Sequence, residues 1–287
     1  MHKDATRGRT EVSAPEPTMS HAGAPVGGLL VLVDPVARRL DGESVRIAKD
    51  VLCAGATAKV SLPDSPEEFA RALARRGHRR LVIVGDDRAL LRAVTLMHRS
   101  RDLAGETLSL IPVGPAHSLA LAGSLGVPLS AVMAARAALD GVVQARDLLV
   151  DDSDGVVLGG LRIPPPVRKQ VPPVRSYRSL LRMLLPSPPG AGGPHAVHRL
   201  RVEADGAVLA DVDHPVQDVA VVTREPGGPA EVVVRLVGCA ALTVRAATVT
   251  VSGADFRYRA DHAAVTGPLR RRTWTLRPGA WSLTVPR

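Results

Sequence analysis

The sequence is poor in aromatic residues and in cysteine. Phe, Trp and Tyr make up 2% of its 287 residues, so it offers few rings on which nucleic-acid bases would stack. Cys53 and Cys239 lie in separate halves, outside any CxxC or Cys/His ligand spacing, so neither a disulfide framework nor a zinc site is indicated. We therefore predict a protein of a reducing cytoplasm with no metal-ligand motif.

Long apolar segments are also absent. Residues 1–28 are polar, rich in Pro, Ala and Gly, and lack the apolar core of a signal peptide. No later run approaches the ~18 uninterrupted apolar residues of a membrane-spanning helix. We expect a disordered tail over residues 1–28 and a cytoplasmic protein that is at most peripheral at the inner membrane surface.

Acidic residues are fewer than basic ones: the sequence has 28 Asp and Glu against 37 Lys and Arg. Its net charge is +9 and its pI is near 10.6. Such an excess favours anionic partners, whether nucleotide phosphates, acidic lipid or nucleic acid. The arginines are spread along the whole chain beside abundant Ala, Gly, Pro and Val, as biased genome composition also produces. Nucleic-acid binding has only net charge in its favour, and we predict no nucleic-acid partner.

What the first half does contain is a regular alternation of apolar strands and helices. Strands are predicted within 29–35, 57–62, 80–87 and 108–114, and helices within 43–56, 65–77, 88–100 and 129–141. This pattern is typical of a parallel sheet covered on both faces, which binds ligands at the carboxyl ends of its strands. Three turns follow such ends and predict one crevice: Asp34-Pro35, Gly85-Asp86-Asp87 and Gly114-Pro115.

The second half has the pattern of antiparallel β structure. Asp154-Gly155 and Asp205-Gly206 each lie between apolar runs, as in tight hairpins. A proline-rich connection over 162–194 encloses a short helix around Ser176 to Leu185. We predict a three-layer α/β domain over 29–146 and an antiparallel β-sandwich over 147–287, whose last segment returns to the first domain.

Neither GxxxxGK[ST] nor GxGxxG is present, but an ordered series of other motifs is. "VDPVARR", "VGDDRALLRAV", "IPVGPAHSLALAGSLGVP", "ALDGVVQARDLL", "VEADG" and "RPGAWSLTVPR" together resemble the diacylglycerol kinase catalytic-domain family of bacterial lipid kinases, which is related to NAD kinases and sphingosine kinases. The resemblance covers about Leu29 to Arg287. It implies an α/β nucleotide-binding domain, a β-sandwich, and ATP with Mg²⁺ phosphorylating a lipid hydroxyl in the cleft between them.

The resemblance assigns a nucleotide site and a base. Asp261 matches the aspartate of the general-base motif, and Asp147 matches the aspartate that begins the second domain. The nucleotide site falls on Asp34, Pro35, Gly85, Asp86, Asp87, Arg88, Ala89, Gly114 and Pro115.

Several matched positions depart from the family pattern. Asp34 replaces an asparagine, and the Gly-Gly-Asp-Gly-Thr loop reads Gly-Asp-Asp-Arg-Ala at Gly85 to Ala89. Of the Gly-Thr-x-Asn-Asp turn only Gly114 remains. Losing one preorganised charge-stabilising donor costs about 10²–10³ in turnover, although the guanidinium of Arg88 is able to grip phosphate oxygens.

Each assigned residue has a simpler interpretation. Asp86 and Asp87 suit the start of the next helix, Asp261 a surface ion pair, and His117 a helix start. Asp151, Asp152 and Asp154 suit a hairpin turn, and His195 and His198 suit a linker. Arg178 and Arg182 fit an anionic membrane surface or a solvated helix edge.

Two functions therefore compete. One is an ATP-dependent lipid kinase with a lipid or membrane partner. The other is a pseudokinase of the same fold that binds lipid, nucleotide or protein. Arg88 in ordinary helical geometry with its side chain in the crevice would argue against ATP.

Overall fold

The computed structural model describes residues 28–164, 197–223, 226–261 and 265–287. The predicted helix around Ser176 to Leu185, including Arg178 and Arg182, lies outside these residues, as do His195 and the tail. No helix among the described residues is both long enough and apolar enough to span a bilayer.

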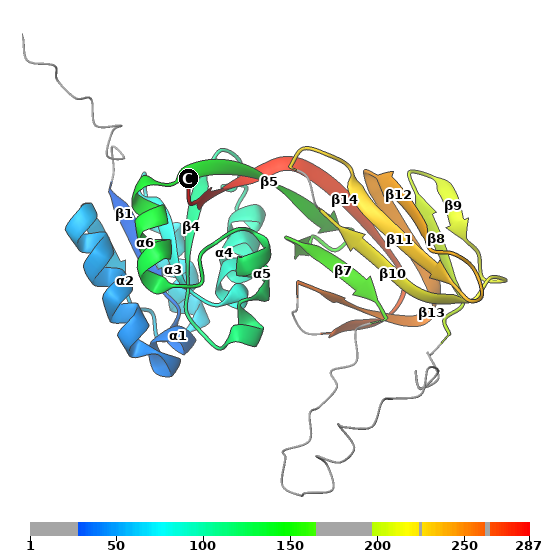
Figure 1. Ribbon diagram of the computed structural model, residues 1–287, viewed down its shortest axis with the longest axis horizontal. Helices are drawn as coiled ribbons and strands as arrows, with labels where there is room; N and C mark the ends of the chain where they lie inside the picture. The colour runs from blue at the N-terminus through cyan, green and yellow to red at the C-terminus, as the bar shows by residue number, and fades with distance from the viewer. Residues whose placement is uncertain (1–27, 165–196, 224–225, 262–264) are drawn as a thin grey trace, which may run out of the picture.

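The first half forms the predicted parallel sheet with helices on both faces (Figure 1). Its strands run in the order β2-β1-β3-β4, and each neighbouring pair is parallel. The strands are β1 (Leu29–Val33), β2 (Ala58–Ser61), β3 (Arg80–Gly85) and β4 (Thr107–Pro112). The helices are α1 (Pro35–Leu40), α2 (Gly42–Gly55), α3 (Pro66–Ala74), α4 (Asp87–Arg99), the 3₁₀ turn η1 (Ala116–Ser118), α5 (Ala120–Ser124) and α6 (Ala131–Asp140).

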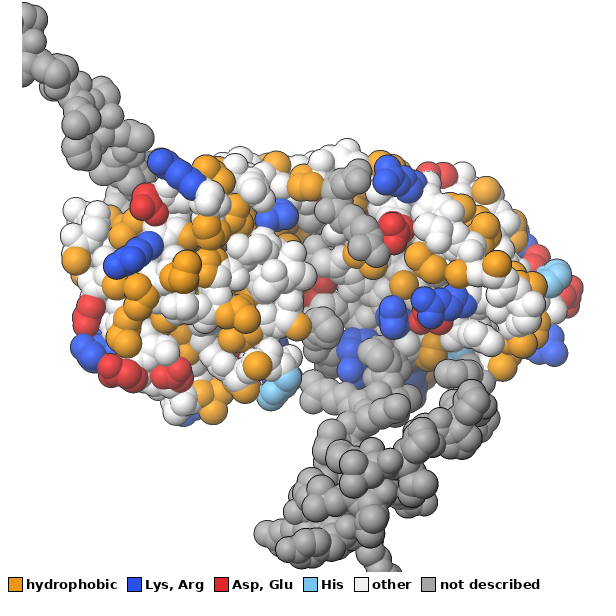
Figure 2. Space-filling view, viewed as in Figure 1, with side chains coloured by type: hydrophobic (Ala, Val, Ile, Leu, Met, Phe, Trp, Pro, Cys, Tyr) orange, Lys and Arg blue, Asp and Glu red, His pale blue; other side chains and the backbone are white. Residues whose placement is uncertain are grey.

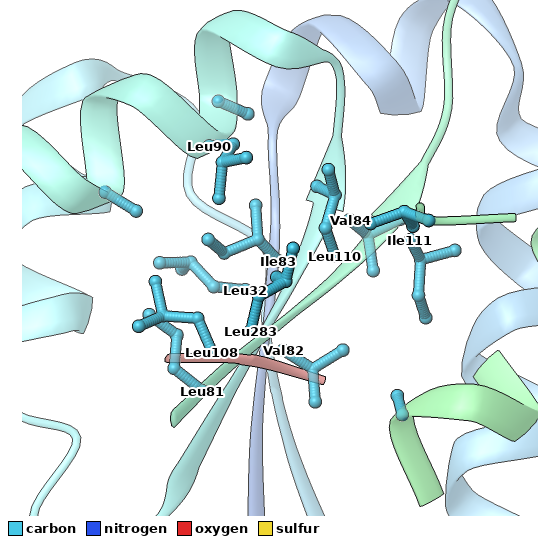
Figure 3. Packing of buried hydrophobic residues seen from close by; sticks show 14 of the residues in the cluster. Leu32, Leu81, Val82, Ile83, Val84, Leu90, Leu108, Leu110, Ile111 and Leu283 are labelled. Atoms are coloured by element: carbon cyan, nitrogen blue, oxygen red, sulfur yellow. The ribbon is translucent and has the colours of Figure 1, made fainter. Parts of the chain in front are cut away.

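The core of this domain explains why its strands are apolar without alternation. Every residue of β1, and β3 from Leu81 onward, is buried, since both faces of the sheet are covered. Figure 3 shows strand side chains such as Ile83 and Leu108 packed with Leu90 of α4. Leu283, near the end of the chain, belongs to the same core.

Side-chain caps set the starts of the helices. Ser65 accepts a hydrogen bond from the backbone N–H of Glu68 (3.2 Å) at the start of α3, as the sequence predicts. Helix α1 was not predicted, because its six residues are too few to show a helical period. Asp34 caps it by accepting from the N–H of Val36 (2.8 Å), and Pro35 suits its first position.

The second half is antiparallel, as predicted. Its strands are β5 (Val142–Asp151), β6 (Val156–Val157), β7 (Gly160–Ile163), β8 (Leu200–Ala204), β9 (Ala207–Ala210), β10 (Val216–Val222), β11 (Ala230–Leu236), β12 (Leu242–Ala246), β13 (Thr248–Ala260) and β14 (Val265–Val285). Asp205 and Gly206 turn the β8–β9 hairpin with φ of 47° and 84°, the positive values that a two-residue type I′ turn requires. The connection between β5 and β6 is longer, over residues 152–155, and Asp154 has a positive φ there (62°).

One long strand ties the two halves together. β14 pairs with β13 in the β domain and with β5 from Trp274 onward, and its end lies parallel to β4, with Ser282 beside Thr107 (Figure 1). The described strands consequently form one 14-stranded sheet. Its two hydrophobic clusters are separate: Trp281 packs in the α/β core, and Trp274 packs in the β core against the edge of Tyr258.

Candidate functional site

The three predicted turns meet at the carboxyl edge of the parallel sheet. A Cβ added to Gly85 would lie 3.0 Å from the Cβ of Asp34 and 2.7 Å from the Cβ of Ala89, so a side chain there has no room. A Cβ on Gly114, whose φ is 152°, would lie 3.4 Å from the Cβ of Asp86. Both glycines therefore serve close approach between the turns.

A small pocket opens where these turns meet. It has a volume of about 200 Å³ and is called the carboxylate pocket below. It is lined by Val36, Leu40, Asp86, Asp87, Arg88, Pro115, His117, Ser118 and Asp261. The fold thus brings Asp261, from the end of the β domain, to the loop at the start of α4. Five other predicted nucleotide-site residues do not line it: Asp34, Pro35, Gly85, Ala89 and Gly114.

The two aspartates of the loop are used by helix starts. Asp86 caps α4, accepting from the N–H groups of Arg88 (3.0 Å) and Ala89 (3.2 Å). Asp87 is 4% exposed and accepts from the N–H groups of Leu121 and Ala122 (both 2.9 Å) at the start of α5. Capping was the simpler interpretation for both residues, and Asp87 caps a helix other than its own.

Asp34 is likewise committed to structure. Its side chain is almost fully buried, and besides capping α1 it forms an ion pair with Arg92 of α4 (2.6 Å). The guanidinium of Arg92 also lies over the ring of Phe69, 5.4 Å from its centroid. Asp34 thus links α1 to α4.

Asp261 is held by the backbone of the β6–β7 turn. Its carboxylate accepts from the N–H groups of Leu158 (2.5 Å), Gly159 (2.7 Å) and Gly160 (3.0 Å). The residue is 8% exposed and has a φ of 44°, so it is not the exposed ion-pair partner of the simpler interpretation. Three of the roughly four lone-pair directions of this carboxylate are occupied by structural donors.

The loop lacks the shape of an open phosphate cradle. Arg88 lies in the first turn of α4 and its side chain lines the carboxylate pocket. Ala89, at the position of the family's threonine, is completely buried. This is the arrangement of Arg88 that argues against ATP.

Mg²⁺ does not fit the residues present. The carboxylates of the pocket accept hydrogen bonds from backbone amides, and a hard cation competes for the same oxygens. Among the residues that the structure describes, no group of three or more His, Cys, Asp or Glu side chains is arranged to hold a metal ion.

A larger cavity lies between the two domains, where the resemblance implies a cleft, but of its lining residues the sequence indicated only Asp261. It has a volume of about 650 Å³, and we call it the arginine cleft. In Figure 2 this face is hollowed between the two halves, with Lys and Arg side chains on the β-domain side. The cleft is lined by Leu121, Ser124, Leu125, Arg146, Gly159, Gly160, Leu161, Arg162, Ala220, Val222, Thr223, Arg259 and Asp261. Arginines are so widespread in the sequence that no local pattern singles out these three.

Asp147 and Asp151 have structural positions beside the cleft. Asp147 is buried and accepts from the N–H groups of Gly227 and Gly279 (2.9 and 2.8 Å), which links the turn before β11 to β14. Asp151 accepts from Ser153 and Gly155 within its hairpin turn. Burial opposes ionisation of Asp151, but the Ser153 and Gly155 hydrogen bonds with nearby Arg272 lower its pKa below the ordinary value.

Comparison with known proteins finds likeness in structure alone. No family model and no curated protein matches the sequence. A diacylglycerol kinase from Bacillus anthracis str. Sterne superposes with a TM-score of 0.62 at 13% identity, over 90% of this chain and 96% of that one. A further structure from that organism reaches a TM-score of 0.68 at 13% identity, over 93% and 97% of the two chains.

An NAD kinase from Archaeoglobus fulgidus, in complex with ATP, gives a TM-score of 0.53 at 13% identity over 89% of this chain and 92% of that one. Both kinds of kinase join a parallel α/β half to an antiparallel β half in one chain, as described above. The chain therefore has the two-domain fold that diacylglycerol kinases and NAD kinases share.

Proposed function

We propose that the chain is a ligand-binding protein with the diacylglycerol kinase fold that does not transfer phosphate. One observation carries the proposal: the carboxylates that the resemblance assigns to ATP chemistry already accept hydrogen bonds from backbone amides. Asp87 and Asp261 do so while 4% and 8% exposed. Releasing either one for catalysis would leave buried donors unsatisfied, at about 1–3 kcal/mol each.

The size and charge of the carboxylate pocket support the same function. Its volume of about 200 Å³ is below the roughly 300–1,000 Å³ of typical small-ligand sites. Asp86, Asp87 and Asp261 contribute three carboxylates against the single guanidinium of Arg88. A triphosphate would meet net repulsion there.

A lipid kinase is the second candidate, and a specific observation favours it. Asp261, the matched base, lines the same pocket as Asp87 and Arg88 of the matched nucleotide loop. Nucleotide binding by this chain also gains support from the ATP-bound NAD kinase that shares its fold. In this alternative Arg88 takes over phosphate contacts from the missing glycine amides.

Titration of the purified full chain with ATP, with and without Mg²⁺, separates the two. We expect no saturable heat of binding at millimolar ATP, and no transfer of labelled phosphate to mixed membrane lipids. Saturable Mg²⁺-ATP binding together with phosphate transfer would overturn the proposal.

Arg88→Ala sharpens the test. If Arg88 grips phosphate, this variant weakens ATP binding about tenfold or more, whereas Arg39→Ala, an exposed arginine on α1, leaves binding unchanged. Under our proposal neither variant has an ATP affinity to lose.

A further inference from the structure

A third cavity shares no lining residue with the two described above. It is a groove of about 330 Å³ on the α/β domain, between strand β2 and helix α3, and we call it the edge groove. It is lined by Leu30, Lys59, Ser61, Glu68, Arg71, Ala72 and Arg75. The groove is therefore a separate feature of the surface, outside the site that the kinase resemblance assigns.

The spacing of the lining residues explains how the groove forms. Phe69 and Leu73 of α3 belong to the hydrophobic core, and the helix packs against β1. A second face of α3, continued at its C-terminal cap, carries the groove residues Glu68, Arg71, Ala72 and Arg75. On β2, Lys59 and Ser61 are two positions apart and so point to the same side of the sheet. Helix α3 thus covers β1 and leaves this side of β2 open.

The backbone of β2 has unpaired groups along one side. Among the described strands, β2 lies at the edge of the sheet and pairs with β1 alone. The N–H of Leu29 donates to the carbonyl of Thr57 (2.8 Å), so the backbone of Thr57 faces β1. Because this direction alternates along a strand, the N–H and C=O groups of Ala58 and Val60 point away from β1. Such an edge is a template on which another strand can pair.

The charge of the edge groove is mainly positive. Lys59, Arg71 and Arg75 line it against one carboxylate, that of Glu68. Glu68 lies 3.6 Å from the Nη2 of Arg71, and its other oxygen accepts from the N–H of Asp64 (2.9 Å). The side chains of Lys59 and Arg75 are exposed and have no hydrogen bond or ion pair within the described part of the chain. Two positive charges beside the free edge of β2 are therefore open to a partner.

These charges select the kind of strand that can pair with β2. A second copy of β2 would bring Lys59 beside its equivalent, and like charges across a strand pair destabilise it. A lysine on an edge strand protects against pairing of that kind. An acidic strand meets charges of opposite sign instead. Its side chains alternate between the two sides of the sheet, so carboxylates at every second position reach the cations of the groove.

We propose that the edge groove binds an extended acidic peptide segment of another protein, which pairs as a strand with β2 and directs alternate carboxylates at Lys59, Arg71 and Arg75. In recognition by strand addition, backbone hydrogen bonds give affinity and alternate side chains give specificity. Here Ala58 and Val60 supply the backbone groups. The inference goes beyond the ligand-binding function proposed above and does not depend on it, because it holds whether or not the chain transfers phosphate.

Calorimetric titration of the full chain tests the partner with three synthetic peptides, each acetylated and amidated at its ends. TEVEVET has glutamates at alternate positions, EEETVVT has the same composition with the glutamates in a block, and TQVQVQT is uncharged. We expect TEVEVET to bind saturably, at least about tenfold more tightly than the other two, with an affinity that falls as salt rises. Equal affinity for EEETVVT or for inorganic tripolyphosphate would mean unspecific attraction of anions and would overturn the proposal.

Amide hydrogen exchange, followed by NMR, tests the strand itself. The N–H groups of Ala58 and Val60 should exchange at least about tenfold more slowly when TEVEVET saturates the chain. Those of Lys59 and Ser61 face β1, so their exchange should change less. Unchanged exchange at Ala58 and Val60 in the saturated complex would show that the peptide does not pair with β2, and the proposal would fail.

Variants then locate the site. Lys59→Gln and Arg75→Gln should each weaken TEVEVET binding about two- to fivefold, and the double variant should weaken it more than either alone. Arg136→Gln removes one positive charge from an exposed position on α6 and should leave binding unchanged. All three positions are exposed, so the melting temperatures should match that of the parent chain. The proposal is overturned if TEVEVET does not bind at millimolar concentration or if the three single variants lose affinity equally.

Discussion

The carboxylate pocket and the arginine cleft meet at Asp261, but their charged groups differ in what already binds them. In the carboxylate pocket, Asp86, Asp87 and Asp261 each accept hydrogen bonds from backbone amides. In the arginine cleft, the Nε atoms of Arg146 and Arg259 lie buried without a partner in the described residues. The fold thus already supplies donors to the carboxylates of one cavity and leaves two N–H donors of the other without an acceptor among the described residues.

The difference has a local cause. The starts of α4 and α5 present N–H groups that have no partner within the helix, and these donors bind carboxylates. An arginine needs acceptors instead. On the strands β7 and β13 the backbone carbonyls of the ladder are already paired, so Arg162 and Arg259 find few. Free backbone N–H groups therefore bind the acidic side chains of one cavity, whereas the basic side chains of the other find few free backbone carbonyls.

The largest expected effect comes from removing the carboxylate that the two cavities share. Asp261→Ala leaves the N–H groups of Leu158, Gly159 and Gly160 without their acceptor. At about 1–3 kcal/mol per unsatisfied donor, we expect a loss of more than about 3 kcal/mol in the free energy of unfolding, measured by urea denaturation. Asp255→Ala is the matched control, because Asp255 lies on β13, which Asp261 directly follows, and also has a positive φ (51°), but is exposed.

A loss below about 1 kcal/mol would show that Asp261 is not structural, and the comparison between the two cavities would fail. Loss of phosphate transfer in an Asp261 variant has meaning only alongside this stability measurement. Without it, a variant that has lost phosphate transfer because it is unfolded would be mistaken for one that has lost a catalytic base.

A smaller loss is expected at Asp87. Asp87→Ala removes the acceptor of two buried N–H groups at the start of α5, so the free energy of unfolding should fall by about 2–4 kcal/mol. Asp86→Ala, which removes an ordinary helix cap, should cost only about 1 kcal/mol. Equal losses in thermal or urea unfolding would contradict the distinct positions assigned to these neighbours.

The smallest effect has the opposite sign. Arg259 lies directly opposite Arg162 in the antiparallel β7–β13 pair. Arg259→Gln removes one of these two opposed positive charges and should raise the free energy of unfolding by about 0.5 kcal/mol in phosphate-free, low-salt buffer. Differential scanning calorimetry at low and high salt measures this, since salt should shrink the gain. Destabilisation at low salt would mean that Arg259 is a structural residue, and the contrast between the two cavities would fail there.

Much of the fold was predictable because its signals are local. Apolar strands and amphipathic helices recur in the first half, and Asp205-Gly206 marks a hairpin that the structure contains. Helix α1 escaped prediction because it is short and its cap, Asp34, was interpreted as part of a turn. The order of motifs indicated the kinase fold, which the structural neighbours confirm.

Which groups each charged side chain contacts was less predictable. The sequence raised helix capping for Asp86 and Asp87, but it did not indicate that Asp87 caps α5, 34 residues away. The resemblance implied a cleft between the domains, but the sequence did not single out its three arginines, because they come from separate strands and resemble the many others in the chain.

By itself, the sequence determined the alternation of elements, the parallel and antiparallel halves and the position of the loop after β3. These follow from the apolar pattern and from turn residues that act over a few positions. Only the tertiary structure decided which charges are satisfied. The donors for Asp261 lie 101 to 103 residues away, and the opposition of Arg162 and Arg259 exists only once β7 and β13 pair.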